Sequence, residues 1–306
     1  MPNRRRRALG ALLSILLVAA GVPAPAVTLE YVGTHVWTGD EPSFGGFSGI
    51  EISADGSRFH ALSDRAWLYW GSVERDAQGR IRGMDVAGRA HLQDSKGQPL
   101  KPGYLGDSEG LAVAPDGTVW VSFEGLDRVA SYADPDGPAT RHKPPPKLPG
   151  THANSGLEAL AIRDDGMIVA IPERSGGEGR PFQILGFDGA DWQQLGELRR
   201  DPRWLVVGAD FGPDGRLYVL ERDFLGILGF ASRVRRVLLT DEGVTEDQIV
   251  LQTRPMQYDN LEGIAVWHDG QGIRLTLVSD DNFLFVQRTE LVEYRLRDEA
   301  GGPGAD

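Results

Sequence analysis

One motif occurs five times in this chain, and the repeat constrains the fold more than any other feature. Each copy reads as a short apolar strand, an Asp-Gly pair, a second apolar strand and then an acidic residue. Asp-Gly between two apolar runs predicts a hairpin, because glycine adopts the positive φ that a tight turn needs. The aspartates of the five pairs are Asp55, Asp116, Asp165, Asp214 and Asp269, at intervals of 61, 49, 49 and 55 residues.

Further strand-like segments lie between the copies: Leu68–Val73, Val129–Tyr132, Phe182–Phe187, Arg233–Leu239 and Gln248–Leu251. About four strands in a period near fifty residues is typical of a β-propeller blade. We therefore predict an all-β propeller of five blades, with six as the alternative if a degenerate copy lies in the long first interval. The last copy lacks a fourth strand, which the segment Val27–Gly33 supplies by pairing with Glu290–Leu296 and closing the ring.

The N-terminus predicts export. Four arginines, Arg4 to Arg7, precede a short apolar run, Ala8 to Val22, and small residues follow up to Ala26. This is the pattern of a signal peptide over residues 1–26, and the apolar run is short for a membrane span. We expect a periplasmic or secreted protein with one propeller domain over residues 27–300 and a disordered tail over 301–306. The chain has no cysteine, which excludes disulfides, thiolate metal sites and a cysteine nucleophile.

The charge balance is acidic, with 44 Asp and Glu against 32 Lys and Arg. Such a surface repels nucleic acid and anionic membranes. It suits cations, or a small anionic ester that arrives with a metal bridge. We expect a monomer with no nucleic-acid partner and no membrane association after signal cleavage.

Acidic residues occupy fixed positions in the repeat. Glu109, Glu158 and Glu262 begin the first strand of their copies, whereas Glu51 and Asp210 stand three residues further along in the other two. If this strand is innermost, the three glutamates converge at one mouth of the channel, where they repel one another unless a cation is present. Oxygen ligands favour Ca²⁺, with Mg²⁺ or Mn²⁺ as alternatives. The competing interpretation is that each acid only caps a strand end.

A second set of acids follows the second strand: Asp64, Glu124, Glu173, Glu221 and Asp280. Arginines come directly after three of them, at Arg65, Arg174 and Arg222. Neighbouring residues on a strand point to opposite faces, so one of each pair reaches the channel. An arginine there binds phosphate or carboxylate oxygens in bidentate fashion, or else it braces the adjacent blade as an ion pair.

Two other features of the sequence give weaker evidence of function. The string Gly106-Asp-Ser108-Glu-Gly110 matches the G-x-S-x-G of serine esterases, but that chemistry needs a strand before the serine and a helix after it. Here a loop precedes Ser108 and a strand follows, so the match is accidental. His152 is the only histidine close to a repeat acid, where it could serve as a ligand or a general base.

Seven strings occur in order along the chain: Gly46-Phe-Ser-Gly-Ile50, Ala61-Leu-Ser-Asp-Arg65, Asp107-Ser-Glu-Gly110, Asn154-Ser-Gly-Leu-Glu158, Leu220-Glu-Arg-Asp-Phe224, Asn260-Leu-Glu-Gly263 and Ser279-Asp-Asp-Asn-Phe283. Together they resemble a known family, the phytase-like domain proteins described as "esterase-like activity of phytase". The resemblance spans residues 29–296 and implies an exported β-propeller with a phosphoesterase or esterase role. It also supports Asp64, Glu109, Glu158, Glu221, Glu262 and Asp280 as a shared acidic set. The fourth copy departs from the pattern, with Val207 where three copies have glutamate.

These observations favour a Ca²⁺-dependent hydrolase of phosphate or carboxylate esters. A propeller lactonase that opens sugar lactones, and a non-catalytic envelope protein that binds a ligand or partner, remain the alternatives, because the fold alone does not decide function. The predicted catalytic residues are Glu109, Glu158, His152 and Arg222. The predicted metal ligands are Glu51, Asp64, Glu109, Glu158, Glu221, Glu262 and Asp280.

Overall fold

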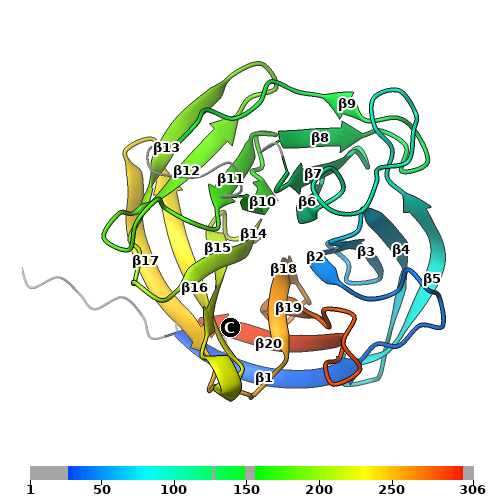
Figure 1. The fold of residues 1–306 in the computed structure, drawn as a ribbon. Helices are drawn as coiled ribbons and strands as arrows, with labels where there is room; N and C mark the ends of the chain where they lie inside the picture. Colours follow the sequence, from blue (N-terminus) through cyan, green and yellow to red (C-terminus); the bar gives the residue numbers. More distant parts are fainter. Residues whose placement is uncertain (1–26, 126–127, 149–155, 299–306) are drawn as a thin grey trace, which may run out of the picture.

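The chain forms a ring of five four-stranded antiparallel sheets around a central axis (Figure 1). A computed structural model describes residues 27–125, 128–148 and 156–298. The predicted signal peptide, the predicted tail and His152 lie outside these residues. Within the described part the only helix is a short 3₁₀ turn, η1 (Gly226–Leu228). Among the described residues, no helix has the length and apolar character needed to cross a bilayer.

The five blades, each given from its innermost to its outermost strand, follow the predicted repeat. Blade 1 contains β2 (Phe47–Ile52), β3 (Arg58–Ser63), β4 (Trp67–Arg75) and β5 (Ile81–His91). Blade 2 contains β6 (Ser108–Val113), β7 (Val119–Phe123), β8 (Arg128–Tyr132) and β9 (Thr140–Arg141). Blade 3 contains β10 (Leu157–Ile162), β11 (Ile168–Pro172), β12 (Phe182–Phe187) and β13 (Trp192–Leu198). Blade 4 contains β14 (Leu205–Phe211), β15 (Leu217–Phe224), β16 (Phe230–Thr240) and β17 (Gly243–Gln252).

Blade 5 closes the ring as predicted, with β18 (Asn260–His268), β19 (Ile273–Asp280), β20 (Glu290–Asp298) and then β1 (Val27–Val36). The N-terminal strand β1 pairs antiparallel with the C-terminal strand β20. Both ends of the described chain are therefore held in one sheet. The long first interval holds no sixth blade, because the extended hairpin of β4 and β5 and the loop after it account for its length.

The Asp-Gly turns have the predicted geometry. In the first copy Gly56 has a φ of 72°, and the Asp55 carboxylate accepts a hydrogen bond of 3.1 Å from the Ser57 amide. The second copy repeats this arrangement with Gly117 at a φ of 90°. An aspartate that binds the backbone two residues on stabilises such a turn. Each turn ends the innermost strand at the same face of the ring.

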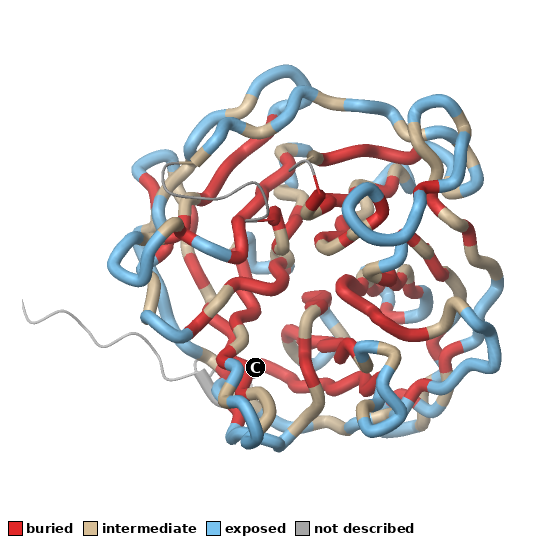
Figure 2. The backbone as a smooth tube through the Cα atoms, in the orientation of Figure 1, coloured by how far each residue is buried: buried red, intermediate tan, exposed pale blue. Residues whose placement is uncertain are grey.

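The core lies between neighbouring blades, because a single blade leaves both of its faces uncovered. One cluster joins Phe47 and Phe59 of blade 1 to Trp267 and Val278 of blade 5. Along the tube in Figure 2 the buried segments follow the strands, whereas the outer loops are exposed. Burial of these faces supplies the main stabilisation of a chain without disulfides.

Glycine at the second position of the motif allows the innermost strands to approach one another closely. A Cβ added at Gly208 would lie 2.6 Å from the Glu262 carbonyl oxygen of the next blade. A Cβ at Gly263 would lie 2.9 Å from the Ile50 backbone nitrogen across the ring closure. Both distances are shorter than a carbon atom tolerates, so the narrow channel depends on these glycines.

Candidate active site at one mouth of the channel

The innermost strands all begin at one mouth of the channel, and each carries a β-bulge at the first position of the motif. The pairing register shifts between Leu157 and Ala159 in blade 3, and between Leu261 and Gly263 in blade 5. Corresponding shifts occur in blades 1, 2 and 4. A bulge leaves a residue out of the ladder and redirects its side chain. The bulges therefore release Glu109, Glu158 and Glu262 from the regular alternation of their strands.

The structure brings these three glutamates into one electrostatic cluster. Burial raises the pKa of Glu109 well above its usual range, and the negative charges of Glu158 and Glu262 raise it further. Burial also raises the pKa of Glu158, and the negative charges of Glu173 and Glu262 raise it further. The pKa of Glu262 is raised by burial too, although Arg222 opposes the shift. The acids at this mouth thus hold more negative charge than the described residues neutralise.

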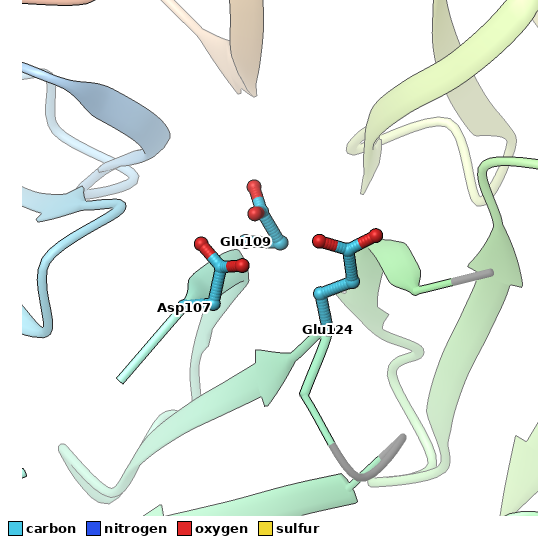
Figure 3. A group of neighbouring side chains, drawn as sticks. All are labelled: Asp107, Glu109 and Glu124. Carbon is cyan, nitrogen blue, oxygen red and sulfur yellow. The ribbon is translucent and has the colours of Figure 1, made fainter. Parts of the chain in front are cut away.

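Three carboxylates on blade 2 form the tightest group (Figure 3). One oxygen each from Asp107, Glu109 and Glu124 lie within 4.8 Å of one another, and all three residues are partly buried. The Glu124 amide donates to the Asp107 carbonyl with a distance of 3.0 Å, which fixes the ends of the two chain segments together. The sequence interpretation did not select Asp107 or Glu124 as ligands. The spacing Asp107-x-Glu109 at the start of the strand was the available signal.

Glu158 approaches this group from the next blade. A Cβ at Gly156 would lie 2.8 Å from Glu124 Cγ and 3.0 Å from Glu158 Oε1. The two side chains therefore flank the same glycine. This packing places Glu158 beside the three carboxylates of blade 2.

Asp64 and Asp280 continue the cluster on blades 1 and 5. Burial raises the pKa of Asp280 to about 8, and the Glu262 and Asp64 charges contribute. Burial raises the pKa of Asp64 to about 6, against the opposing charge of Arg65. Asp280 also accepts a hydrogen bond of 2.6 Å from the Asn282 amide. Both acids that were predicted from the repeat thus lie at this mouth.

Blade 4 contributes an arginine where the other blades contribute an acid. Arg222 is opposite Leu205 in the ladder, as Asp280 is opposite Asn260 in blade 5. The Arg222 guanidinium contacts the Glu262 carboxylate and donates to Asn260 Oδ1 at 3.1 Å. Its Nη2 atom lies 3.6 Å from the Glu173 carboxylate. One cation therefore lies among several carboxylates of neighbouring blades.

Glu221 does not join the cluster, which corrects its assignment to the second acidic set. Its side chain is fully buried and accepts hydrogen bonds from Arg233 Nε at 2.5 Å and Arg235 Nη1 at 3.2 Å. The reason is register: Arg222, like Glu124 and Glu173, stands eight residues after its turn aspartate, whereas Glu221 stands seven. A shift of one residue moves a side chain to the other face of a strand.

Glu51 and Asp210 form a separate pair, deeper in the channel than the mouth. Burial raises the pKa of Glu51 well above its usual range and the Asp210 charge raises it further; burial also raises the pKa of Asp210, to about 7. Asp210 accepts a hydrogen bond of 2.6 Å from the Val266 amide. Between this pair and the mouth, each innermost strand contributes one apolar residue, two positions after the bulged residue. These five residues form an apolar collar around a cavity of about 10 Å³. The collar residues are Ile50, Leu111, Leu160, Ala209 and Ile264.

Ser108 has a structural role, in agreement with the rejection of the esterase string. Its side chain is fully buried at the start of β6. The hydroxyl donates to the Ser63 carbonyl at 2.7 Å and accepts from the Ala66 amide at 2.9 Å. It therefore joins blade 2 to blade 1 through backbone groups.

Two of three comparisons relate the chain to known proteins. A search of curated proteins finds no match. Among solved structures, the chain is similar to a PQQ-bound aldose sugar dehydrogenase from Streptomyces coelicolor, with 16% identity, 90% of this chain and 100% of that chain covered, and a TM-score of 0.49. It is also similar to a gluconolactonase from Xanthomonas campestris, with 16% identity, 82% and 72% covered, and a TM-score of 0.42. The family described as "Phytase-like: Esterase-like activity of phytase" matches residues 42–283, so the chain belongs to this family.

Proposed function

We propose that this protein is a Ca²⁺-dependent hydrolase of phosphate or carboxylate esters. The observation that carries the proposal is the grouping of Asp107, Glu109 and Glu124, with Arg222 across the same mouth. Three hard oxygen donors suit a divalent cation, and the remaining positions would be open to substrate and water. The membership of a phytase-like family supports the same class of reaction.

The residues present fit the cation on two grounds. Their oxygens lie within 4.8 Å of one another, close enough to bind one ion after small side-chain movements. Burial and neighbouring acids raise the pKa of Glu109, so this carboxylate gains from a compensating positive charge. A bound Ca²⁺ would polarise the ester and lower the pKa of a bound water. The predicted export would take the protein out of the cytoplasm, to a compartment where even low-affinity calcium sites are filled.

Arg222 and Glu158 supply the other roles in this proposal. Arg222 Nη1 is held by Asn260 and Glu262, whereas Nη2 is beyond normal hydrogen-bond distance of Glu173. We assign Nη2 to an anionic oxygen of the substrate, where it stabilises the charge that develops during attack. We assign Glu158, which borders the blade 2 carboxylates, to accepting the proton of the attacking water.

The experiment compares hydrolysis of p-nitrophenyl phosphate and p-nitrophenyl acetate in Ca²⁺ and in EDTA. We expect turnover of at least one ester in Ca²⁺ and its loss in EDTA. Glu109→Gln should lower kcat by roughly 100-fold or more and abolish the thermal stabilisation by Ca²⁺. Glu158→Gln should lower kcat by roughly 10²–10⁴-fold while retaining that stabilisation. Glu197→Gln, on the outer strand β13, is the matched control and should leave both unchanged.

The outcomes separate the alternatives. Absence of turnover on both ester classes with Ca²⁺, Mg²⁺ and Mn²⁺ would contradict the hydrolase. Strong stabilisation by Ca²⁺ together with that absence would instead support a protein that binds a ligand at this mouth without catalysis.

A further inference from the structure

Many of the exposed apolar side chains lie in loops on the face of the ring that holds the acids. Thirteen large hydrophobic residues are exposed in the described part of the chain. Eight of them lie in loops that enter the innermost strands or leave the second strands, and a ninth, Phe224, ends the second strand β15. The other four, Tyr31, Val36, Val86 and Ile249, lie on outermost strands, and none lies in the turns at the opposite mouth. The nine are Tyr104, Leu105, Phe224, Ile227, Leu228, Met256, Leu284, Phe285 and Val286.

One part of this surface follows Arg222 directly. The β15–β16 hairpin tip carries Phe224 and Ile227, which are 64% and 97% exposed. Phe224 packs on Phe230 with ring centroids 5.0 Å apart, and the Met256 amide donates to the Phe230 carbonyl at 3.1 Å. The β15–β16 hairpin and the loop that holds Met256 therefore lie together. Phe224 is two residues after Arg222 in the chain.

The other part follows Asp280. Asp281 holds the loop by accepting hydrogen bonds from the Gly46 amide at 2.9 Å and the Phe283 amide at 3.0 Å. Phe283 has a φ of 52°, and its ring lies beneath the Arg65 guanidinium, with 3.3 Å between the ring centroid and Arg65 Cζ. Phe285 is 99% exposed at the end of this braced turn. Backbone hydrogen bonds from Leu284 to the Asp281 carbonyl and from Gln287 to the Leu284 carbonyl hold the segment that exposes it.

We define the apolar rim as Phe224, Ile227, Leu228, Met256 and Phe285. We infer that the substrate is an amphiphilic ester, whose reacting group lies among the acids while an acyl or alkyl group lies on this rim. The inference rests on the proposed function, because it assigns the reacting group to the same mouth. The position of the rim in the chain supports this inference. Phe224, Ile227 and Leu228 come directly after Arg222, and Phe285 is in the loop that begins after Asp280.

Charge supports the same substrate class. Among the described residues, eight carboxylates lie at this mouth. Arg222 interacts with four of them, Arg65 acts on Asp64, and Arg174 pairs with Glu173, so the acids outnumber the cations. A substrate with many negative charges would meet strong repulsion here, whereas an apolar group meets none and buries exposed hydrophobic surface. A single anionic or carbonyl oxygen is matched to the Arg222 guanidinium, whose Nη2 lies 3.6 Å from the Glu173 carboxylate.

The experiment measures chain-length selectivity in Ca²⁺. We expect kcat/KM for p-nitrophenyl octanoate to exceed that for p-nitrophenyl acetate by roughly tenfold or more. The double variant Ile227→Ser/Phe285→Ser should lose most of this ratio through a fall in kcat/KM for the octanoate. Ile249→Ser, an exposed apolar residue on β17, is the matched control and should keep the ratio. Equal rates for the two esters, or a ratio that survives in the double variant, would overturn the inference.

A binding measurement separates failure of the rim from failure of the hydrolase. Octylphosphonate should bind the Ca²⁺-loaded protein roughly tenfold more tightly than ethylphosphonate, and the double variant should lose this difference. This readout does not require turnover, so it tests the rim even if no ester is hydrolysed. Rim-dependent binding to phosphatidylcholine vesicles without any chain-length dependence toward the phosphonates would show a membrane-binding surface and overturn the substrate assignment.

Discussion

Two aspartates at opposite ends of one hairpin show how differently this fold treats buried charge. Asp269, in the turn before β19, is buried, which opposes ionisation, yet the Gln271 amide and the Arg274 and Arg295 guanidinium groups lower its pKa to about 2. Asp280, at the end of β19, is buried too, and with other acids around it its pKa rises to about 8. The same residue type is thus held ionised at one mouth of the ring and resists ionisation at the other.

The difference separates charges that are balanced within the fold from charges that form the proposed cation site. At the turn mouth Arg274 is almost fully buried between Asp269 and Glu293, so opposite charges balance. Glu221 with Arg233 and Arg235 repeats this balance inside blade 4. At the acid mouth carboxylates outnumber their cationic partners, which is unfavourable for a site with only a structural role. Three substitutions or conditions test this contrast.

The largest expected effect comes from Asp269→Asn. The change leaves Arg274 and Arg295 without their shared carboxylate in a buried setting, so we expect a loss of about 3–5 kcal/mol in the free energy of unfolding. Urea denaturation at pH 7 measures it. Asp116→Asn alters the same motif position at an exposed turn that has no arginine partner and should change stability by less than about 0.5 kcal/mol. Equal losses in the two variants would show that the turn itself, and not the charge balance, supplies the stability.

The next effect is stabilisation by Ca²⁺ and its dependence on pH. The acids at the mouth have raised pKa values, so they hold protons at low pH and must release them to bind a cation. We expect Ca²⁺ at about 100 times its Kd to add about 2.7 kcal/mol at pH 8 and much less at pH 5. Thermal unfolding in Ca²⁺ and in EDTA at both pH values measures the difference. A shift that is independent of pH, or that persists in Glu109→Gln, would argue against binding at this mouth.

The smallest effect is a gain in stability from Asp280→Asn without metal. Since the folded pKa of about 8 lies above the ordinary 3.8, the folded state binds the proton more tightly. Wild-type stability should therefore fall as pH rises from about 4 to about 8, and the neutral asparagine avoids this loss. In EDTA at pH 9 we expect the variant to melt roughly 2–4 °C higher than wild type, with little difference at pH 5. A lower melting temperature at pH 9 would mean that the Asp280 charge stabilises the fold.

The sequence was sufficient to predict the propeller, its five blades and the closure by the N-terminal strand. These features depend on local signals that each copy repeats, namely the Asp-Gly turn and the apolar strands around it. The convergence of Glu109, Glu158 and Glu262 also followed, because residues at one motif position lie at one level of a ring. Repetition turns a local pattern into a global arrangement.

Register decided what the sequence interpretation missed. Glu221 and Arg222 are adjacent, and only the ladder with Leu205 and Val206 shows that the arginine reaches the mouth while the glutamate enters a buried ion-pair network. Asp107 lies outside the repeated strand, and its place beside Glu124 depends on the meeting of two segments across a hairpin.

The sequence by itself therefore determined the architecture and the level at which most of the acids lie, because a period of about fifty residues with fixed turns permits one kind of ring. Only the tertiary structure decided which side chains share a site. Side-chain direction in a strand changes with every residue and with every bulge, and charge balance depends on neighbours from other blades. A buried aspartate is an ion-pair partner or a candidate ligand according to the arginines that the fold brings beside it.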